Sequence, residues 1–441
     1  MIDREPGWVA QAAGGRLVAG DAGGLGPRRA VVDSREIEAG DLFVGLVGAS
    51  ADGGEFAARA LEAGAWGALV GPHRAEELAA KADGAAVIAA DNTLLALQRL
   101  ARDWRRQLGC PLVGITGSTG KTSTKDILRA LLSQQLKTHA NAQNWNTEIG
   151  LPLSILAAER GVEALVLEMA MRGEGQIAEL VEIAEPDVGV IVNVGPVHLE
   201  LLGTVERVAA AKAELIRDLR PGATCVIPVN EPLLDPHRRD DVRTITFGEG
   251  GDVSLISFDG ELAEIEAYGN PISLELSFSE PHNVLNTLAA VAAATALGLE
   301  PSGRVEPEFS SYRGEIVELE GGVTVVNDCY NANPMSMRAA LDHLAGTPAE
   351  RRLAILGTMA ELGPDSRRFH REIGEHAAAL GIDVLITVGE EALAFGEGFD
   401  GDTQAVATPE EAGALLEELA QPGDRVLVKG SRAVGLERVL A

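Results

Sequence analysis

The sequence Pro111-Leu-Val-Gly-Ile-Thr-Gly-Ser-Thr-Gly-Lys-Thr122 is an apolar run that leads into a glycine-rich turn and then into a helical pattern. A strand, a glycine-rich loop and a helix in this order form a phosphate-binding loop, whose backbone N–H groups surround phosphate oxygens. In such a loop Lys121 reaches the outer phosphates and Thr122 offers its hydroxyl to Mg²⁺. The first glycine of the usual motif would fall at Ile115, whereas this chain has Gly114. The segment therefore predicts a nucleotide-binding α/β domain with an unusual loop spacing.

The composition limits the kinds of protein that this chain can be. It has 441 residues, 46% of them hydrophobic, and a formal net charge of −29 at pH 7. The acidic charge argues against binding to nucleic acid or to anionic membrane surfaces, and no apolar run is long enough to predict membrane insertion. The three cysteines are widely spaced, and the N-terminus lacks the apolar core of a signal peptide. These features favour a protein of the reducing cytoplasm.

The pattern of apolar runs predicts an α/β protein with three domains. Residues 1–108 alternate short apolar runs with Gly-rich turns, and the helical stretch 93–107 closes this N-terminal domain. Residues 109–310 contain continuous apolar runs, which are typical of parallel strands buried on both faces, and turn to short strands over 242–278. Residues 311–441 alternate strands and helices again, which predicts a smaller, doubly wound, Rossmann-like domain.

Polar side chains follow the predicted strands of the middle domain at the end where ligands bind in open parallel sheets. One strand ends at Glu168, and another leads to Asn193, with His198 in the loop after it. A carboxylate and an imidazole would join Thr122 and phosphate oxygens around Mg²⁺, which takes few protein ligands and keeps several waters. Spacing alone leaves open that Glu168 and His198 are ordinary strand-end and loop residues.

Three further features allow either a structural or a functional interpretation. Lys212 lies in an Ala-rich helical stretch and is either a solvated lysine or one whose enclosure lowers its pKa. The amide-rich segment 141–152 is either a cluster of turn residues or a surface that hydrogen-bonds a polar substrate. Asp33, Ser34 and Arg35 form either a local cap or a site in which Arg35 pairs with a phosphate.

Together these segments resemble the Mur ligase family of ATP-dependent amide-bond-forming enzymes, over nearly the whole chain. Residues 33–44 resemble the family's N-terminal UDP-substrate domain, and residues 117–122 are similar to its ATP loop, with the same displaced first glycine. Residues 282–290 resemble the helix start whose asparagines lie by the adenine. Residues 327–334 carry the most type-specific similarity, with residues 356–363 and 429–432 beside them.

The resemblance implies a set of site residues. The implied catalytic residues are Lys121, His198 and Lys212 (carbamylated), and the implied metal ligands are Thr122, Glu168 and His198. The implied ATP-binding residues are Gly117, Ser118, Thr119, Gly120, Lys121, Thr122, Asn283, Asn286, Arg313 and Asp328. The implied substrate-binding residues are Asp33, Ser34, Arg35, Asn144, Asn146, Thr147, Asn331, Asn333, Lys429, Ser431 and Arg432.

The resemblance also implies an activity. It implies an ADP- and phosphate-forming ligase that joins D-alanyl-D-alanine to UDP-N-acetylmuramoyl-tripeptide through an acyl phosphate, in the peptidoglycan synthesis that supports cell wall biogenesis, cell shape and cell division. The implied cofactors are ATP, two Mg²⁺ ions and the carbamylated lysine, and the implied state is a cytoplasmic monomer. The alternatives are a related ligase that adds the third residue of the peptide and a nucleotide-dependent binding protein that does not ligate. Thr147 departs from the asparagine usual at its position.

Overall fold

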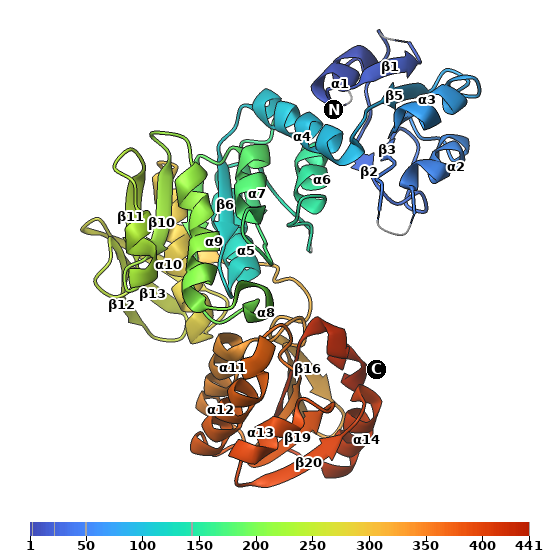
Figure 1. The fold of residues 1–441 in the computed structure, drawn as a ribbon. Coiled ribbons are helices and arrows are strands. Elements are labelled where there is room, and N and C mark those ends of the chain that lie inside the picture. Colours follow the sequence, from blue (N-terminus) through green and yellow to red (C-terminus); the bar gives the residue numbers. More distant parts are fainter. Residues whose placement is uncertain (2, 22, 49–50, 143, 441) are drawn as a thin grey trace.

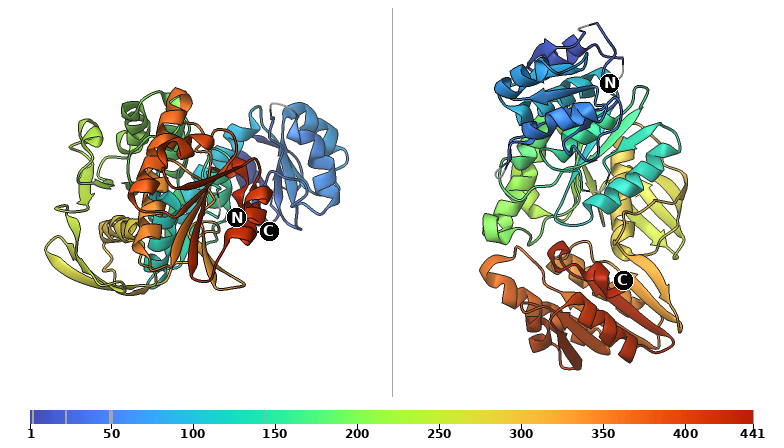
Figure 2. Two further views of the ribbon diagram at one scale, coloured as in Figure 1. Left: turned by 90° about the horizontal axis from the view of Figure 1, so that it is seen from below. Right: turned by 90° about the vertical axis from the view of Figure 1, so that its right-hand side faces the viewer.

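The computed structural model describes residues 1, 3–21, 23–48, 51–142 and 144–440, which form three α/β units, each built on its own sheet (Figure 1). The units follow one another in space as in the sequence, with the N-terminal and C-terminal units at opposite ends of the molecule (Figure 2). The predicted three-domain α/β class is confirmed.

The N-terminal unit is a five-stranded sheet in the order β1-β5-β4-β3-β2, parallel except where β1 pairs with β5. Its helix α4 begins at the Asn92 cap, which accepts a hydrogen bond from the Leu95 amide, and ends at Gly109, whose φ is 67°. The strands are β1 (Arg16–Ala19), β2 (Ala30–Val31), β3 (Leu42–Val44), β4 (Gly67–Val70) and β5 (Ala86–Ala89), and the helices are α1 (Pro6–Ala12), α2 (Ala57–Glu62), α3 (Pro72–Ala79) and α4 (Thr93–Leu108).

Helix α4 connects the N-terminal unit firmly to the middle one. The indole of Trp104 is fully buried and donates a hydrogen bond to the carbonyl of Ala158 at 3.0 Å. Arg105 is also buried, and it donates to the carbonyl of Ala184 at 3.1 Å and to the carboxylate of Asp187 at 2.8 Å. The helix thus packs on both units, and a domain division after residue 108 stays a prediction.

The middle unit is a ten-stranded sheet in the order β15-β14-β13-β12-β11-β10-β9-β6-β8-β7. Strands β6 to β11 are parallel to one another, whereas β12, β13 and β14 form an antiparallel meander. The strands are β6 (Leu112–Thr116), β7 (Thr138–Ala140), β8 (Ala164–Glu168), β9 (Val188–Ile191), β10 (Thr224–Pro228), β11 (Arg243–Phe247), β12 (Val253–Phe258), β13 (Leu262–Ala267), β14 (Asn270–Leu276) and β15 (Gly303–Val305). The helices are α5 (Lys121–Ser133), α6 (Gly150–Ala157), α7 (Gln176–Ala184), α8 (Leu199–Leu202), α9 (Val205–Asp218) and α10 (Pro281–Ala296).

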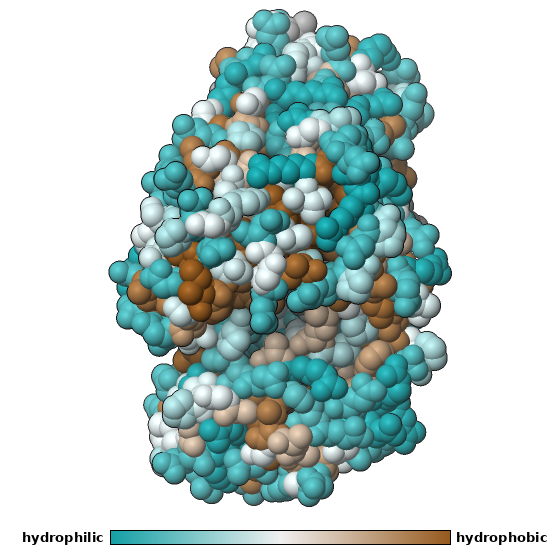
Figure 3. Space-filling view, turned by 90° about the vertical axis from the view of Figure 1, so that its left-hand side faces the viewer, coloured by the Kyte–Doolittle hydropathy of each residue, from teal (hydrophilic) through white to brown (hydrophobic). Residues whose placement is uncertain are grey.

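The C-terminal unit is a six-stranded sheet in the order β16-β17-β21-β18-β19-β20, parallel except for the edge strand β16. It forms a separate lobe, and the surface is indented where this lobe meets the middle unit (Figure 3). The strands are β16 (Glu315–Leu319), β17 (Val323–Asn327), β18 (Arg351–Gly357), β19 (Val384–Val388), β20 (Asp402–Val406) and β21 (Asp424–Lys429), and the helices are α11 (Pro334–Gly346), α12 (Ser366–Ala379), α13 (Leu393–Gly398) and α14 (Pro409–Leu419).

The segment that joins the last two units is attached to helix α5. Both the amide and the hydroxyl of Ser310 donate to Asp126 Oδ2, at 3.2 and 3.1 Å. The other oxygen of this buried carboxylate pairs with the buried ammonium of Lys125 at 3.1 Å. The linker is therefore fixed to the helix that follows the phosphate loop.

Within the described part of the chain, no helix has both the length and the apolar character needed to cross a bilayer.

Candidate functional site

The phosphate loop follows β6, the central one of three neighbouring parallel strands in the order β9-β6-β8. Gly120 adopts a left-handed conformation with φ 73° and turns the chain into α5, while Lys121 Nζ folds back to donate to the carbonyl of Gly117 at 2.9 Å. The amides of Ser118 and Thr119 both donate to the side-chain oxygen of Asn193, at 3.1 and 2.9 Å. The first-turn amides of α5, which have no intrahelical acceptor, are thus the donors left for a phosphate group.

Gly120 gives a first prediction, because both its backbone and its surroundings exclude a side chain. A left-handed conformation costs a non-glycine residue about 1–2 kcal/mol, and a Cβ atom here would lie 2.7 Å from Asn286 Oδ1. Gly120→Ala is expected to lower the melting temperature and to weaken ATP binding measured by calorimetry. Gly161→Ala is a matched control, since Gly161 has a φ of 81° but no heavy atom within 4 Å of the added Cβ. Equal ATP affinity in the two variants would contradict the prediction.

Glu168 ends β8 beside the phosphate loop and is almost fully buried. Its Oε2 accepts a hydrogen bond from Thr122 Oγ1 at 2.7 Å, and its Oε1 accepts one from Asn146 Nδ2 at 2.8 Å. The buried amide of Asn141 bonds both the amide and the carbonyl of Glu168, at 2.9 and 3.2 Å. The carboxylate is therefore held in place from both sides, with its negative charge next to the Thr122 hydroxyl.

Lys212, on α9, has a buried side chain whose relative exposure is 2%. Its ammonium makes neither a hydrogen bond nor an ion pair with the described residues. Burial first, and the nearby charge of Lys121 second, hold the pKa of Lys212 well below its ordinary value. Burial also lowers the pKa of Lys121, an effect that the Glu168 carboxylate opposes. Lys212 is thus an enclosed amine that favours the neutral, nucleophilic form, which contradicts the solvated-lysine interpretation.

His198 lies in the loop between β9 and α8, where it meets the C-terminal unit. Its Nδ1 hydrogen-bonds Glu361, a residue of the loop that follows β18. Burial lowers the pKa of His198, whereas the bond to Glu361 raises it. The structure brings His198 to the boundary between the two units, and a direct hydrogen bond from His198 to Glu168 or Thr122 is not found among the described residues.

The predicted ATP-binding residues outside the loop come from both units. Asn283 and Asn286 are buried at the start of α10, where Asn286 Nδ2 donates to Asn283 Oδ1 at 3.3 Å. The guanidinium of Arg313 lies over the Tyr330 ring, 4.1 Å from its centroid, and its charge contributes to the lowered pKa of Lys121. Arg313, on the C-terminal side of the linker, is therefore near the phosphate loop.

Asp328, predicted to bind ATP, and Lys429, predicted to bind substrate, are paired with each other in the structure. The ammonium of Lys429 is buried, with an Nζ to Asp328 Oδ2 distance of 2.5 Å, and it also donates to the carbonyl of Asn331 at 3.1 Å. The pair lies where adjacent parallel strands β17 and β21 end. A ligand ribose would therefore meet a carboxylate that already neutralises a lysine.

Several predicted substrate-binding side chains have structural partners. The side-chain oxygen of Asn333 caps α11 by accepting a hydrogen bond from the backbone amide of Ser336 at 3.0 Å. The backbone amide of Asn333 donates in turn to Ser336 Oγ. Ser431 Oγ accepts from the Ala360 amide at 2.9 Å. The remaining residues of this set are Asn144 and Thr147, both exposed, Asn331, whose Oδ1 accepts from the Ala332 amide, and Arg432, which pairs with Glu437. Gln143, in the same amide-rich segment, lies outside the described residues.

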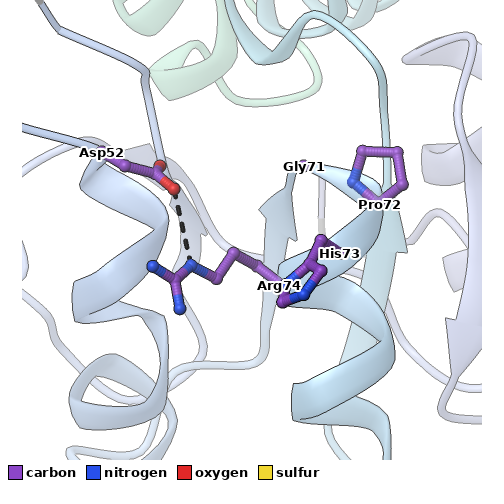
Figure 4. Close-up of a pocket in the computed structure, with 5 residues that line it drawn as sticks. All are labelled: Asp52, Gly71, Pro72, His73 and Arg74. Carbon is purple, nitrogen blue, oxygen red and sulfur yellow. Dashed lines mark hydrogen bonds and ion pairs between the residues drawn. The ribbon is translucent and has the colours of Figure 1, made fainter.

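The N-terminal candidates lie apart from the phosphate loop, in a different unit. Arg35 is exposed and pairs with Asp33, and this hydrogen bond lowers the pKa of Asp33 to about 2. A shallow depression nearby is lined by Asp52 and residues 71–74 (Figure 4). Its arginine, Arg74, pairs with Asp52, Glu55 and Glu77 at 2.9–3.5 Å. Because carboxylates already surround this cation, we assign no anion site to the depression.

Family models match most of the chain in three consecutive parts. The Mur ligase family catalytic domain matches residues 31–105, the Mur ligase middle domain matches residues 115–294, and the Mur ligase glutamate ligase domain matches residues 312–432. The UDP-N-acetylmuramoyl-tripeptide–D-alanyl-D-alanine ligase of Synechocystis sp. is 39% identical over 419 residues, which cover 93% of this chain and 90% of that ligase. The chain belongs to the Mur ligase family.

Other Mur ligases extend the similarity. The Bacillus subtilis ligase of the same name is 34% identical and is matched over 91% of its length by 92% of this chain. A crystal structure of MurF from Acinetobacter baumannii has a TM-score of 0.88 and 28% identity, covering 99% of this chain and 98% of that one. The MurF ligase from Thermotoga maritima, solved in complex with ADP, has a TM-score of 0.80 and 35% identity, covering 94% and 96%. The resemblance inferred from the sequence is confirmed.

The residues of this Mur ligase fit magnesium bound together with a nucleotide. The Thr122 hydroxyl and the Glu168 carboxylate are 2.7 Å apart, and Mg²⁺ usually takes one or two carboxylates plus phosphate oxygens and waters. In the described ranges no three His, Cys, Asp or Glu side chains form a ready-made metal site. This donor set suits a cation that arrives with the nucleotide. The unpartnered amine of Lys212 fits a carbamate, which requires a neutral lysine.

Four residues near the site of this Mur ligase were not among the predicted site residues. Asn193 was noted only as a strand end, yet it binds the phosphate-loop amides. Asn141, which holds Glu168, lay in the amide-rich segment and was detectable there. Asp126 contacts Ser310, 184 positions away, and Glu361 contacts His198, 163 positions away. No local pattern indicates Asp126, whereas Glu361 lies within residues 356–363, a segment that resembles the family.

Proposed function

We propose that the protein is an ATP-dependent ligase that joins D-alanyl-D-alanine to UDP-N-acetylmuramoyl-tripeptide, releasing ADP and phosphate, in the synthesis of peptidoglycan precursors. One observation carries the proposal within the family. Lys121 and the Thr122–Glu168 pair lie where the neighbouring strands β6 and β8 end. The charge of Lys121 contributes to the lowered pKa of the enclosed Lys212, on α9. The proposal includes two Mg²⁺ ions, a carbamate on Lys212, and action as a monomer in the cytoplasm.

The chain's own residues suggest how the reaction would proceed. Lys121 would hold the outer phosphates and offset charge on the γ-phosphoryl group as it moves to the tripeptide carboxylate, forming an acyl phosphate. Arg313 would add a second positive charge from the C-terminal unit. Bound Mg²⁺ would neutralise phosphate charge beside Thr122 and Glu168. The amine of D-alanyl-D-alanine would then attack the acyl carbon and release phosphate, and docking of the C-terminal unit would limit attack by water.

The proposed function is tested by measuring phosphate release and product mass together. Incubation with ATP, Mg²⁺, the UDP-muramoyl tripeptide and D-alanyl-D-alanine is expected to yield the pentapeptide product, with phosphate release that requires both substrates. A product extended by a single amino acid would instead identify the related ligase. Phosphate release that is equal without the dipeptide, or nucleotide binding with no peptide product, would contradict the proposal.

Glu168 gives a prediction about the metal requirement of this reaction. Glu168→Gln keeps a similar shape but removes the charge beside Thr122, so the Mg²⁺ concentration for half-maximal activity is expected to rise about tenfold. The measurement is a Mg²⁺ titration at saturating ATP. Glu159→Gln is the matched control, because that side chain is exposed and pairs with Lys137. An unchanged Mg²⁺ dependence in Glu168→Gln would remove this residue from the metal site.

A further inference from the structure

Two residues from different units adopt left-handed backbone conformations and contact each other. His198, which precedes α8, has a φ of 53°, and Glu361, in the loop after β18, has a φ of 62°. Only six non-glycine residues in the described ranges have positive φ, a conformation that is strained for any residue with a Cβ atom. Strained backbones persist where the surrounding structure holds them, and they cluster at functional sites. That two of the six meet across one boundary singles out this contact.

Glu361 contacts the middle unit through both its side chain and its backbone. One carboxylate oxygen hydrogen-bonds His198 Nδ1, and the other lies 3.5 Å from Arg172 Nε. The carbonyl of Glu361 accepts from the amide of Glu200 at 3.2 Å. A Cβ at the following Gly363 would come within 3.2 Å of Glu200 Cα, so the two chains approach closely here. Helix α8 indeed lies against the C-terminal unit in the ribbon view (Figure 1).

The loop that carries Glu361 is held rigidly by its own unit. The amide of Met359 donates to Nε2 of His370 at 2.9 Å, and Nδ1 of this fully buried imidazole donates to the carbonyl of Ser366 at 2.7 Å. The next amide, of Ala360, donates to Ser431 Oγ. The position of Glu361 relative to His198 therefore depends on how the two units are docked rather than on independent movement of the loop.

The contact decides which nitrogen of His198 carries a proton. A carboxylate only accepts hydrogen bonds, so His198 Nδ1 must donate, and in the neutral ring Nε2 is then left unprotonated. An unprotonated ring nitrogen is the form that binds a metal ion, and a carboxylate on the other nitrogen fixes the ring and raises its basicity. The partner of His198 comes from the other unit.

We propose that Glu361 is a positioning residue, which fixes His198 as the Nδ1–H tautomer only while the C-terminal unit is docked on the middle unit. The inference rests on the proposed function, in which His198 would bind a cation. The contact with Glu361 would prepare His198 for that role only in the docked arrangement. Phosphoryl transfer would then be favoured only after the units have come together. The inference concerns His198 and Glu361 themselves, and it is measurable without a ligation assay.

The first measurement is the tautomer of His198. Ring ¹⁵N shifts of histidine-labelled protein, assigned by comparison with His198→Gln, are expected to show a protonated Nδ1 and an unprotonated Nε2 in the wild-type protein. In Glu361→Ala the Nδ1–H tautomer of His198 is expected no longer to predominate. In Glu361→Gln, whose side-chain amide oxygen still accepts a hydrogen bond, it is expected to remain the main tautomer. The matched control is Glu200→Gln, which removes the same charge at the same boundary from an exposed side chain without a hydrogen bond in the described structure.

The second measurement is the affinity for Mn²⁺, used as a probe with ADP and followed by electron paramagnetic resonance. Loss of a carboxylate behind a histidine ligand weakens metal affinity about 10–100-fold. The Mn²⁺ affinity of Glu361→Ala is therefore expected to fall by a factor in this range, and that of Glu200→Gln to match the wild type. The inference is overturned if Glu361→Ala, folded as shown by an unchanged melting temperature, keeps the wild-type tautomer and Mn²⁺ affinity, or if Glu200→Gln shifts both equally. A tautomer change in a protein that fails the ligation assay would overturn the proposed function and leave the inference standing.

Discussion

Replacing Lys121 by methionine is expected to lower kcat/KM for ligation about 10³-fold, the size of effect seen when one preorganised donor to a developing charge is removed. The reason is the position of the ammonium, which already lies against the phosphate loop through its hydrogen bond to the carbonyl of Gly117. Methionine fills a similar volume, so the loss reports the charge rather than a cavity. The measurement is steady-state phosphate release with both substrates present.

The control for Lys121→Met is Lys137→Met, which removes a lysine charge at an exposed site. It is expected to leave kcat/KM within twofold of the wild type, since exposed ion pairs contribute about 0–1 kcal/mol. Wild-type kcat in Lys121→Met, with the melting temperature unchanged, would show that the loop does not carry out phosphoryl transfer.

Replacing Lys212 by alanine is expected to lower activity about 10–100-fold, as for loss of a group that supports a bound metal. The buried amine has no partner among the described residues, and its lowered pKa favours the neutral form that reacts with CO₂. The carbamate would place a negative charge close to Lys121. Acetate or propionate is expected to restore part of the activity of Lys212→Ala, because the shortened side chain leaves room for a carboxylate.

Lys212→Met provides the comparison, since it also removes the amine but fills the space. Short carboxylates are expected to rescue the alanine variant and not the methionine variant, in dose–response assays at constant ionic strength. Full activity in Lys212→Ala would show that the amine has no part in the reaction.

The sequence predicted those parts of the protein whose causes are local. The phosphate loop is a strand, a turn and a helix within one short segment, and Glu168 ends an apolar run of the kind typical of a buried strand. The structure places Glu168 as expected, at the end of β8, because strand ends of a parallel sheet share one edge. Helix α5 begins at Lys121, within the motif itself, since Gly120 in its left-handed conformation turns the chain into the helix.

Long-range contacts explain what the sequence could not reveal. Composition favoured a solvated Lys212, and only its packing in the folded chain shows the amine to be enclosed. The side chain of Asn333, a predicted substrate-binding residue, caps the helix that follows, a role open to any asparagine before a helix. The partner of His198 lies 163 residues away in another unit, where neither periodicity nor spacing could indicate it.

The hydrogen bonds from Ser310 to Asp126 limit how far the start of the C-terminal unit can move from helix α5. Only two residues separate this fixed point from Arg313, and three residues of fully extended chain span about 10 Å. While these hydrogen bonds persist, the Cα of Arg313 stays within about this distance of the Cα of Ser310, and so close to helix α5. Opening of the molecule would release substrates and product without carrying Arg313 away from the nucleotide, so that each new docking starts with this charge already in the neighbourhood of the phosphates.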